Sequence, residues 1–170
     1  MDKDAMNYDS HAKRSDNSCL YEPEIGKYYE GGIVFYIDKA SRRCLIVSPV
    51  DQFSVPWSLG VDSIGATGTA VFTGQQNTEI MLAHDTAAGT AAKVCASYIV
   101  NGFDDWYLPS RDELIALTSV YFWGGHEPPG PLWSSSETGG YFAYQVSSGN
   151  ATNDGKVISY PTRPIRTASY

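Results

Sequence analysis

Residues 104–114 read Asp-Asp-Trp-Tyr-Leu-Pro-Ser-Arg-Asp-Glu-Leu, a loop that leads directly into a helix start. Pro109 disfavours the α conformation for the residue before it, so the chain should be extended up to that point. Ser110 is then a good N-cap, and Glu113 follows at the spacing of a capping box. The apolar residues from Leu114 onward have roughly helical spacing, which predicts a helix with one face in a core. No nucleophile stands beside a base in this stretch, so we expect it to serve structure rather than catalysis.

Length and composition predict a single domain with a short appendage. The chain has 170 residues, of which 42% are hydrophobic, with 12 Tyr, 4 Trp and 16 Gly. This balance favours short strands and long ordered loops over a helical bundle. The formal charge of −7, with dispersed Lys and Arg, argues against nucleic acid or an anionic membrane surface as a partner. No apolar run reaches the roughly 18 residues of a membrane-spanning helix, so we expect no membrane insertion.

The first 24 residues differ from the rest of the chain. They are rich in Asp and Asn and lack apolar periodicity, which predicts a leader or linker over residues 1–24 and a folded domain over 25–170. The carboxylates could bind a hard cation such as calcium, or the segment could be a loose terminus; both readings stay open. The three cysteines, Cys19, Cys44 and Cys95, form no CxxC pair. Their disulfide status is left open, and a zinc site is not expected.

The remaining pattern predicts an α+β domain. Residues 33–37 and 44–47 are expected to form a hairpin, and residues 51–76 a long ordered loop with Trp57 and Phe72 as anchors. Two helices are expected: residues 78–84, with Thr78 as the N-cap, and residues 90–99, with Cys95 and Ile99 on one apolar face. Further strands are expected at residues 132–137, 141–146, 156–160 and 162–166, with a turn at 149–155. Because Pro164 cannot donate to a ladder, the last strand should lie at an edge or carry a bulge. Strands at both ends, with helices between them, indicate that the termini meet in one small antiparallel sheet.

Four blocks of the sequence occur in an order typical of one known family. They are Gly31-Gly32-Ile33-Val34-Phe35, residues 105–114, Leu132-Trp133-Ser134-Ser135-Ser136-Glu137 and Arg163-Pro164-Ile165-Arg166. Together they cover roughly residues 26–168 and resemble the Lcl C-terminal-domain family, named for a collagen-like bacterial adhesin and related to the C-type-lectin-like superfold. Residues 1–20 resemble the short acidic, Cys-terminated repeats of surface proteins.

The resemblance implies a C-type-lectin-like fold and a binding module of the kind displayed on surface adhesins, secreted proteins and phage tails, often as trimers. It implies that Trp106, Leu108 and Pro109 are core and corner residues. It also implies that Arg163 and Arg166 are partners of buried polar groups. The expected location is extracellular, at a cell surface or on a virion.

Calcium-dependent lectins of this superfold use a Glu-Pro-Asn or Gln-Pro-Asp loop and a later Asn-Asp pair. The present chain has Glu127-Pro128-Pro129 and, further on, Asn153-Asp154. The carboxylate chemistry suits calcium. Glu127, Asn153 and Asp154 are therefore the candidate calcium ligands, although Pro129 replaces one amide ligand.

The leading expectation is a non-enzymatic recognition or adhesion module that binds a glycan or a surface receptor through residues 126–156. Tyr and Trp give large rigid contacts and Asn gives adaptable hydrogen bonds, as recognition loops require. The candidate ligand-binding residues are Trp133, Glu137, Tyr141, Tyr144, Asn150, Asn153 and Asp154. The alternative is a structural, homotrimeric cap or decoration of a fibre, phage tail or virion protein. A distant branch of the same superfold generates formylglycine with active cysteines, so the resemblance also raises an enzyme. An enzyme is not expected here, because Cys44 and Cys95 fall in predicted strand and helix interiors rather than in a paired, exposed site.

Overall fold

The fold is a mixed α+β domain. The computed structural model of the chain describes residues 3, 8–11, 21–50, 54–85, 87–123 and 130–170. Within these residues, three helices accompany strands that all pair antiparallel. The predicted α+β class is therefore confirmed. Most of the predicted leader lies outside the described residues, so its boundary at residue 24 stays a prediction.

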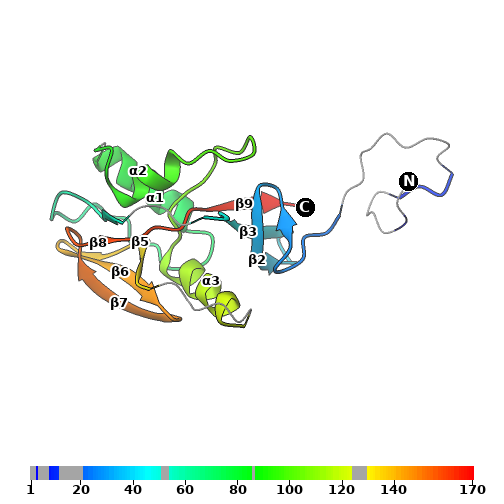
Figure 1. Cartoon of the computed structure of the whole chain (residues 1–170). Helices are drawn as coiled ribbons and strands as arrows, with labels where there is room; N and C mark the ends of the chain where they lie inside the picture. Colours follow the sequence, from blue (N-terminus) through cyan, green and yellow to red (C-terminus); the bar gives the residue numbers. More distant parts are fainter. Residues whose placement is uncertain (1–2, 4–7, 12–20, 51–53, 86, 124–129) are drawn as a thin grey trace.

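The first sheet joins the two ends of the domain. Its order is β1-β2-β3-β9, formed by β1 (Tyr28–Tyr29), β2 (Gly32–Asp38), β3 (Arg43–Val47) and β9 (Ile165–Ser169). The predicted hairpin of β2 and β3 is confirmed, and Figure 1 shows the C-terminus beside this sheet. The last strand begins at Ile165, directly after Pro164, and pairs at the sheet edge as expected.

A second, three-stranded sheet contains β5 (Leu132–Gly139), β6 (Phe142–Ser147) and β7 (Asn150–Gly155). The prediction of a turn over residues 149–155 is wrong, since residues 150–155 form β7 and pair with β6 along their whole length. Ser148 and Gly149 make the turn instead, with φ of 50° and 78°. Two consecutive positive φ values are typical of a tight hairpin turn. A short pair, β4 (Val55–Pro56) and β8 (Ser159–Tyr160), completes the strands described.

Three helices connect the sheets: α1 (Gly74–His84), α2 (Ala91–Ala96) and α3 (Arg111–Trp123). Helix α3 lies between the two larger sheets (Figure 1). Its predicted capping box is confirmed, because the Ser110 N–H donates to Glu113 Oε2 (2.7 Å) and the Glu113 N–H donates to Ser110 Oγ (3.3 Å). Helix α2 ends earlier than predicted, and Ile99 is 70% exposed rather than part of an apolar face.

Helix α1 begins four residues before the predicted cap at Thr78. Thr78 is buried inside the helix, where its hydroxyl bonds the Gly74 carbonyl (2.8 Å) and accepts the Leu108 N–H (3.1 Å). The helix start packs directly on the 108–113 corner. A Cβ on Gly74 would lie 2.3 Å from Glu113 Oε2 and 2.7 Å from the Ser110 nitrogen. This close approach requires glycine at position 74.

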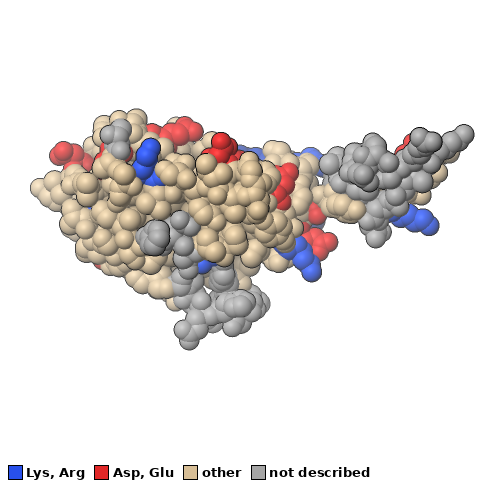
Figure 2. Space-filling model, turned by 45° about the horizontal axis from the view of Figure 1, so that its top comes forward, with Lys and Arg blue, Asp and Glu red and all other residues tan. Residues whose placement is uncertain are grey.

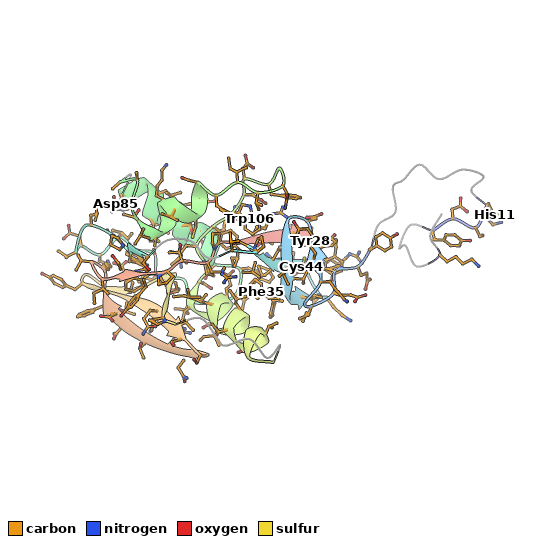
Figure 3. The ribbon with its side chains drawn as sticks, viewed as in Figure 1. His11, Tyr28, Phe35, Cys44, Asp85 and Trp106 are labelled. Atoms are coloured by element: carbon orange, nitrogen blue, oxygen red, sulfur yellow. The ribbon has the colours of Figure 1, made fainter. Side chains whose placement is uncertain are left out.

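Three consecutive residues join the three parts of the core. Trp106 belongs to the cluster with Val34, Cys44, Ile46 and Ala168. Tyr107 belongs to the cluster with Phe35, Leu114, Val146 and Ile165. Leu108 belongs to the cluster with Trp57, Met81, Cys95 and Trp133. All three are buried. Figure 3 shows Trp106 where the loops meet the first sheet, with Cys44 and Phe35 on that sheet. Residues 106–108 therefore tie the sheets and helices into one body.

Candidate functional site

The structure moves Trp133 from the predicted recognition surface into the core. Its ring is buried and meets the Tyr160 ring edge to face, with centroids 4.9 Å apart. Its Nε1–H donates to the carbonyls of Val55 (3.1 Å) and Ile158 (3.2 Å). Because its polar atom is satisfied inside the domain, Trp133 holds β5 against the β4–β8 pair and offers no exposed face to a ligand.

Glu137 is also buried, which corrects its predicted surface position. The Lys156 Nζ donates to Glu137 Oε1 (2.5 Å) and to the Asp62 carbonyl (2.8 Å), and both charged side chains are fully shielded from solvent. The N–H groups of Ile64 and Gly65 also donate to the carboxylate. Burial alone would raise the pKa of Glu137, but Lys156 and the backbone donors outweigh it and hold that pKa below its ordinary value.

Asp154 and Asn153 lie next to each other on β7, so their side chains point to opposite faces of the sheet. Asp154 Oδ2 accepts the Tyr160 hydroxyl hydrogen (2.6 Å), and this hydrogen bond raises the pKa of Tyr160. Among the described residues, no three His, Cys, Asp or Glu side chains gather to hold a metal. Glu127 lies outside the described residues, so the predicted calcium set stays a prediction.

The other predicted residues are accessible but do not share one face of the second sheet, because Asn150 and Asn153 are three residues apart on β7 and point to opposite faces. Tyr141 is 64% exposed, Asn150 and Asn153 are exposed, and Tyr144 is half-buried. Asn153 is the cross-strand partner of Tyr144. The Arg111 guanidinium carbon lies 5.2 Å from the centroid of the Tyr144 ring. A ring, an amide and a guanidinium thus stand together at the start of α3.

Phe142 belongs to the same face as Tyr144, because the two residues alternate along β6. It is 49% exposed. Its cross-strand neighbours are Gly139 and Gly155, which have no side chains to cover the ring. Phe142 was not predicted as a surface residue. Tyr144 was predicted to contact a ligand, and the alternation of side chains along β6 places Phe142 on the same face, which is the signal that points to it.

Three segments far apart in sequence meet beside this strand. The Lys156 N–H donates to the Tyr141 carbonyl (3.0 Å), and the Ser58 N–H donates to the Lys156 carbonyl (3.3 Å). A Cβ on Gly140 would lie 3.2 Å from the Val61 carbonyl oxygen. Each segment exposes apolar side chains, which we call the distal surface: Leu59, Val61, Tyr141, Phe142, Val157 and Ile158.

The distal surface lies at the end of the domain away from the C-terminus and from residues 21–29, where the described chain enters the first sheet. Figure 1 shows β8 and the turn between β5 and β6 on the left, while Tyr170 and the segment that enters at Tyr21 lie on the right. Single exposed apolar residues are ordinary, but a group from three adjoining segments marks an interaction surface. Acidic and basic residues are scattered over the face seen in Figure 2, with no basic patch there.

The described cysteines have no activated thiol. Burial raises the pKa of Cys44 to about 11 and that of Cys95 to about 12. Both thiols are therefore protonated at neutral pH and act as small apolar core residues, which confirms the burial expected for Cys95. Cys19 lies outside the described residues.

No model of a known protein family matches the chain, and no curated protein sequence matches it. Within the described residues, no helix is both long enough and apolar enough to cross a bilayer.

Proposed function

We propose that the chain is a non-enzymatic recognition module that binds a glycan or a protein receptor at a cell or virion surface. The observation that carries this proposal is the exposure of Tyr141 and Phe142 on the distal surface. Aromatic rings with free faces supply large contacts at a small cost in conformational entropy. Asn153, on the strand next to β6, adds a hydrogen-bonding group beside Tyr144, whereas Asn150 pairs with Ser147 at the other end of the β6–β7 hairpin from Phe142.

The proposal includes a C-type-lectin-like fold of the Lcl C-terminal type. Three features support it: the terminal strands share one sheet, long segments connect short elements, and the resembling blocks lie at junctions of the fold. Arg166 illustrates the last point. Its guanidinium makes a two-point contact with Asp105 (2.7 and 2.9 Å) and a further bond to the Glu30 carbonyl (3.0 Å). Arg166 is thus a structural partner at this junction, although the Asp105 and Glu30 side chains that it contacts are exposed rather than buried as the resemblance implies.

Binding through the distal surface also suits the position of the chain ends. A domain attached to a larger assembly through its terminal sheet would present its far end outward. Since the distal surface is opposite that sheet (Figure 1), tethering would leave it accessible. An extracellular or virion location follows from the proposal.

The test is a glycan array probed with the full chain, with and without a calcium chelator, together with a panel of intact cell surfaces. The proposal expects saturable binding to at least one glycan or surface. Loss of binding with chelator would show that binding requires calcium, as the predicted set Glu127, Asn153 and Asp154 implies, and retention would remove calcium from the account. Absence of binding to every glycan and surface would contradict the recognition role.

The alternative function is a homotrimeric structural cap or decoration. The distal surface favours this alternative, because contact between copies of the chain would bury its exposed apolar side chains. Measurement of the mass in solution distinguishes the two functions. A stable trimer in which Leu59 and Tyr141 are protected from labelling supports the cap, whereas a monomer leaves the distal surface free for a ligand.

A further inference from the structure

The two edges of the second sheet differ. On the β5 side, loops accept hydrogen bonds from the strand. The Ser135 N–H donates to the Pro109 carbonyl (2.7 Å), and the Glu137 N–H donates to the Ala66 carbonyl (2.7 Å). On the other side lies β7, which pairs only with β6 among the described strands. Figure 1 shows β7 along the outer margin of the domain. The sheet is therefore closed at β5 and open at β7.

The hairpin turn determines which backbone groups of β7 face outward. Ser147 and Asn150 flank the two-residue turn, so they form a hydrogen-bonded pair. Hydrogen-bonded and non-hydrogen-bonded pairs alternate along an antiparallel ladder. Every second residue from Asn150 therefore bonds to β6, whereas Ala151 and Asn153 direct their N–H and C=O groups away from it. Within the described part of the chain, no backbone group bonds to these outward groups.

Strand β7 lacks the features that keep sheet edges apart. Natural edge strands are commonly very short or bulged, or they carry Lys or Pro. Strand β7 has six residues without Lys, Arg or Pro, and its register with β6 is continuous. Its single charge, on Asp154, is half-buried and accepts the Tyr160 hydroxyl hydrogen (2.6 Å). A further strand can therefore add to this edge without meeting an exposed charge or a missing donor.

The sequence of β7 is complementary to a second copy of itself. An antiparallel pairing centred on Thr152 places this residue opposite Thr152 of the second copy, and cross-strand Thr–Thr contacts are favourable. Ala151 then lies opposite Asn153 of the second copy, and two-fold symmetry repeats this pair. Each pair exchanges two backbone hydrogen bonds, about four in total. Asn150 lies opposite Asp154, so no like charges face each other.

We propose that two copies of the chain pair through β7, antiparallel about Thr152. The pairing joins the second sheets into one continuous sheet with three strands from each copy. The contact is a narrow edge rather than a broad apolar face, and stable interfaces bury about 1,200 Å² or more, so the dimer is weak and reversible. It uses none of the residues of the distal surface, and the proposal therefore does not rest on the proposed function.

The first experiment combines sedimentation of the full chain with amide hydrogen exchange, over a range of about a hundredfold in concentration. We expect the mean mass to rise toward that of two copies. The amide exchange of Ala151 and Asn153 should slow as the concentration rises, whereas that of Thr152, which already bonds to β6, should not change. A constant mass of one copy, a trimer, or exchange at Ala151 and Asn153 that is independent of concentration would overturn the proposal.

A charge swap at the symmetry centre tests the register. Thr152→Lys and Thr152→Glu should each weaken the dimer about tenfold or more, because two like charges then lie opposite each other. An equimolar mixture of the two should pair again, more strongly at low salt than at high salt. Thr152 is exposed, so both variants should melt as the unaltered chain does. A Thr152→Lys chain that dimerises normally, or a mixture that stays monomeric, would contradict the pairing.

Two further variants separate β7 from other surfaces. Ile99→Lys adds the same charge at a side chain that is 70% exposed outside β7, and it should dimerise as the unaltered chain does. Tyr141→Ala, on the distal surface, should also leave the dimer unchanged. A dimer that is lost in Tyr141→Ala and kept in Thr152→Lys would form through the distal surface, which would overturn pairing through β7.

Discussion

Tyr107 and Ile165 exchange two backbone hydrogen bonds, 2.8 and 3.0 Å long, and so join the middle of the chain to its last strand. Their neighbours extend this junction in both directions. Trp106 and Leu108 enter different parts of the core, and Arg166 binds Asp105. The corner at residues 106–108 therefore connects both sheets.

The first prediction concerns the corner itself. Trp106→Ala should lower the free energy of unfolding by roughly 3–5 kcal/mol, because a fully buried ring is removed and a cavity remains. Thermal and denaturant melts measure this change. Tyr141→Ala removes an exposed ring and is the matched control, with an expected change within about 0.5 kcal/mol. Equal melting of the two variants would contradict the role assigned to Trp106.

The second prediction concerns the contact of α1 with the capping box of α3. Gly74→Ala should destabilise the domain by roughly 1–3 kcal/mol, since the added methyl group would collide with Glu113 and the backbone of Ser110. Gly89→Ala is the control, because a Cβ there meets no atom within 4 Å. Urea unfolding of both variants gives the comparison. A Gly74→Ala chain as stable as the unaltered one would contradict the close approach of position 74 to Glu113 and Ser110.

The third prediction concerns the buried ion pair. Lys156→Met should cost roughly 3–5 kcal/mol, since it leaves Glu137 charged and buried without its cation. The lost contact between Lys156 Nζ and the Trp57 ring, 4.7 Å from the centroid, adds to this cost. Denaturant unfolding at neutral pH measures it. A loss below about 1 kcal/mol, the range of exposed pairs, would mean that the pair is solvated.

The same pair predicts a pH dependence. The pKa of Glu137 is lowered in the folded state. Its contribution to the free energy of unfolding is therefore fully present above the pKa of Glu in the unfolded chain, about 4.3, and is lost as pH falls through the folded-state pKa. The gap in stability between the unaltered chain and Lys156→Met should therefore narrow below about pH 4. Burial raises the pKa of Glu113, so the contribution of Glu113 to stability changes with pH in the opposite direction. That contribution is the same in both chains and cancels from the difference in their stability. A gap that widens on acidification would contradict this assignment.

Local rules predicted the corner and the first hairpin because the information lies within a few residues. The capping box of Ser110 and Glu113 spans only four consecutive residues, and β2 and β3 are continuous apolar runs on either side of a polar turn. Strand β7 was missed for the converse reason. Its Asn- and Asp-rich sequence is typical of a turn, and it becomes a strand only because β6 is available to pair with it.

Trp133 and Glu137 show why the candidate site was only partly predicted. Their partners, Val55, Ile64 and Lys156, are distant in sequence, and no spacing rule indicates that a Trp or a Glu will be covered by them. Tyr141, named as a ligand-binding candidate for its residue type, is exposed, and its binding role stays a prediction. Leu59 was missed because a single apolar residue in a loop carries no periodic signal. Val157 was missed because a strand was predicted over residues 156–160, whereas only Ser159–Tyr160 form β8.

The most direct test of the recognition proposal compares three chains on the best-bound target from the array. Surface plasmon resonance should show that Tyr141→Ala with Phe142→Ala reduces affinity about tenfold or more, because exposed aromatic anchors dominate such contacts. Ile99→Ala, which removes a side chain 70% exposed outside the distal surface, should bind as the unaltered chain does. All three chains should melt at similar temperatures. Equal affinity of the double variant and the unaltered chain would contradict recognition through the distal surface.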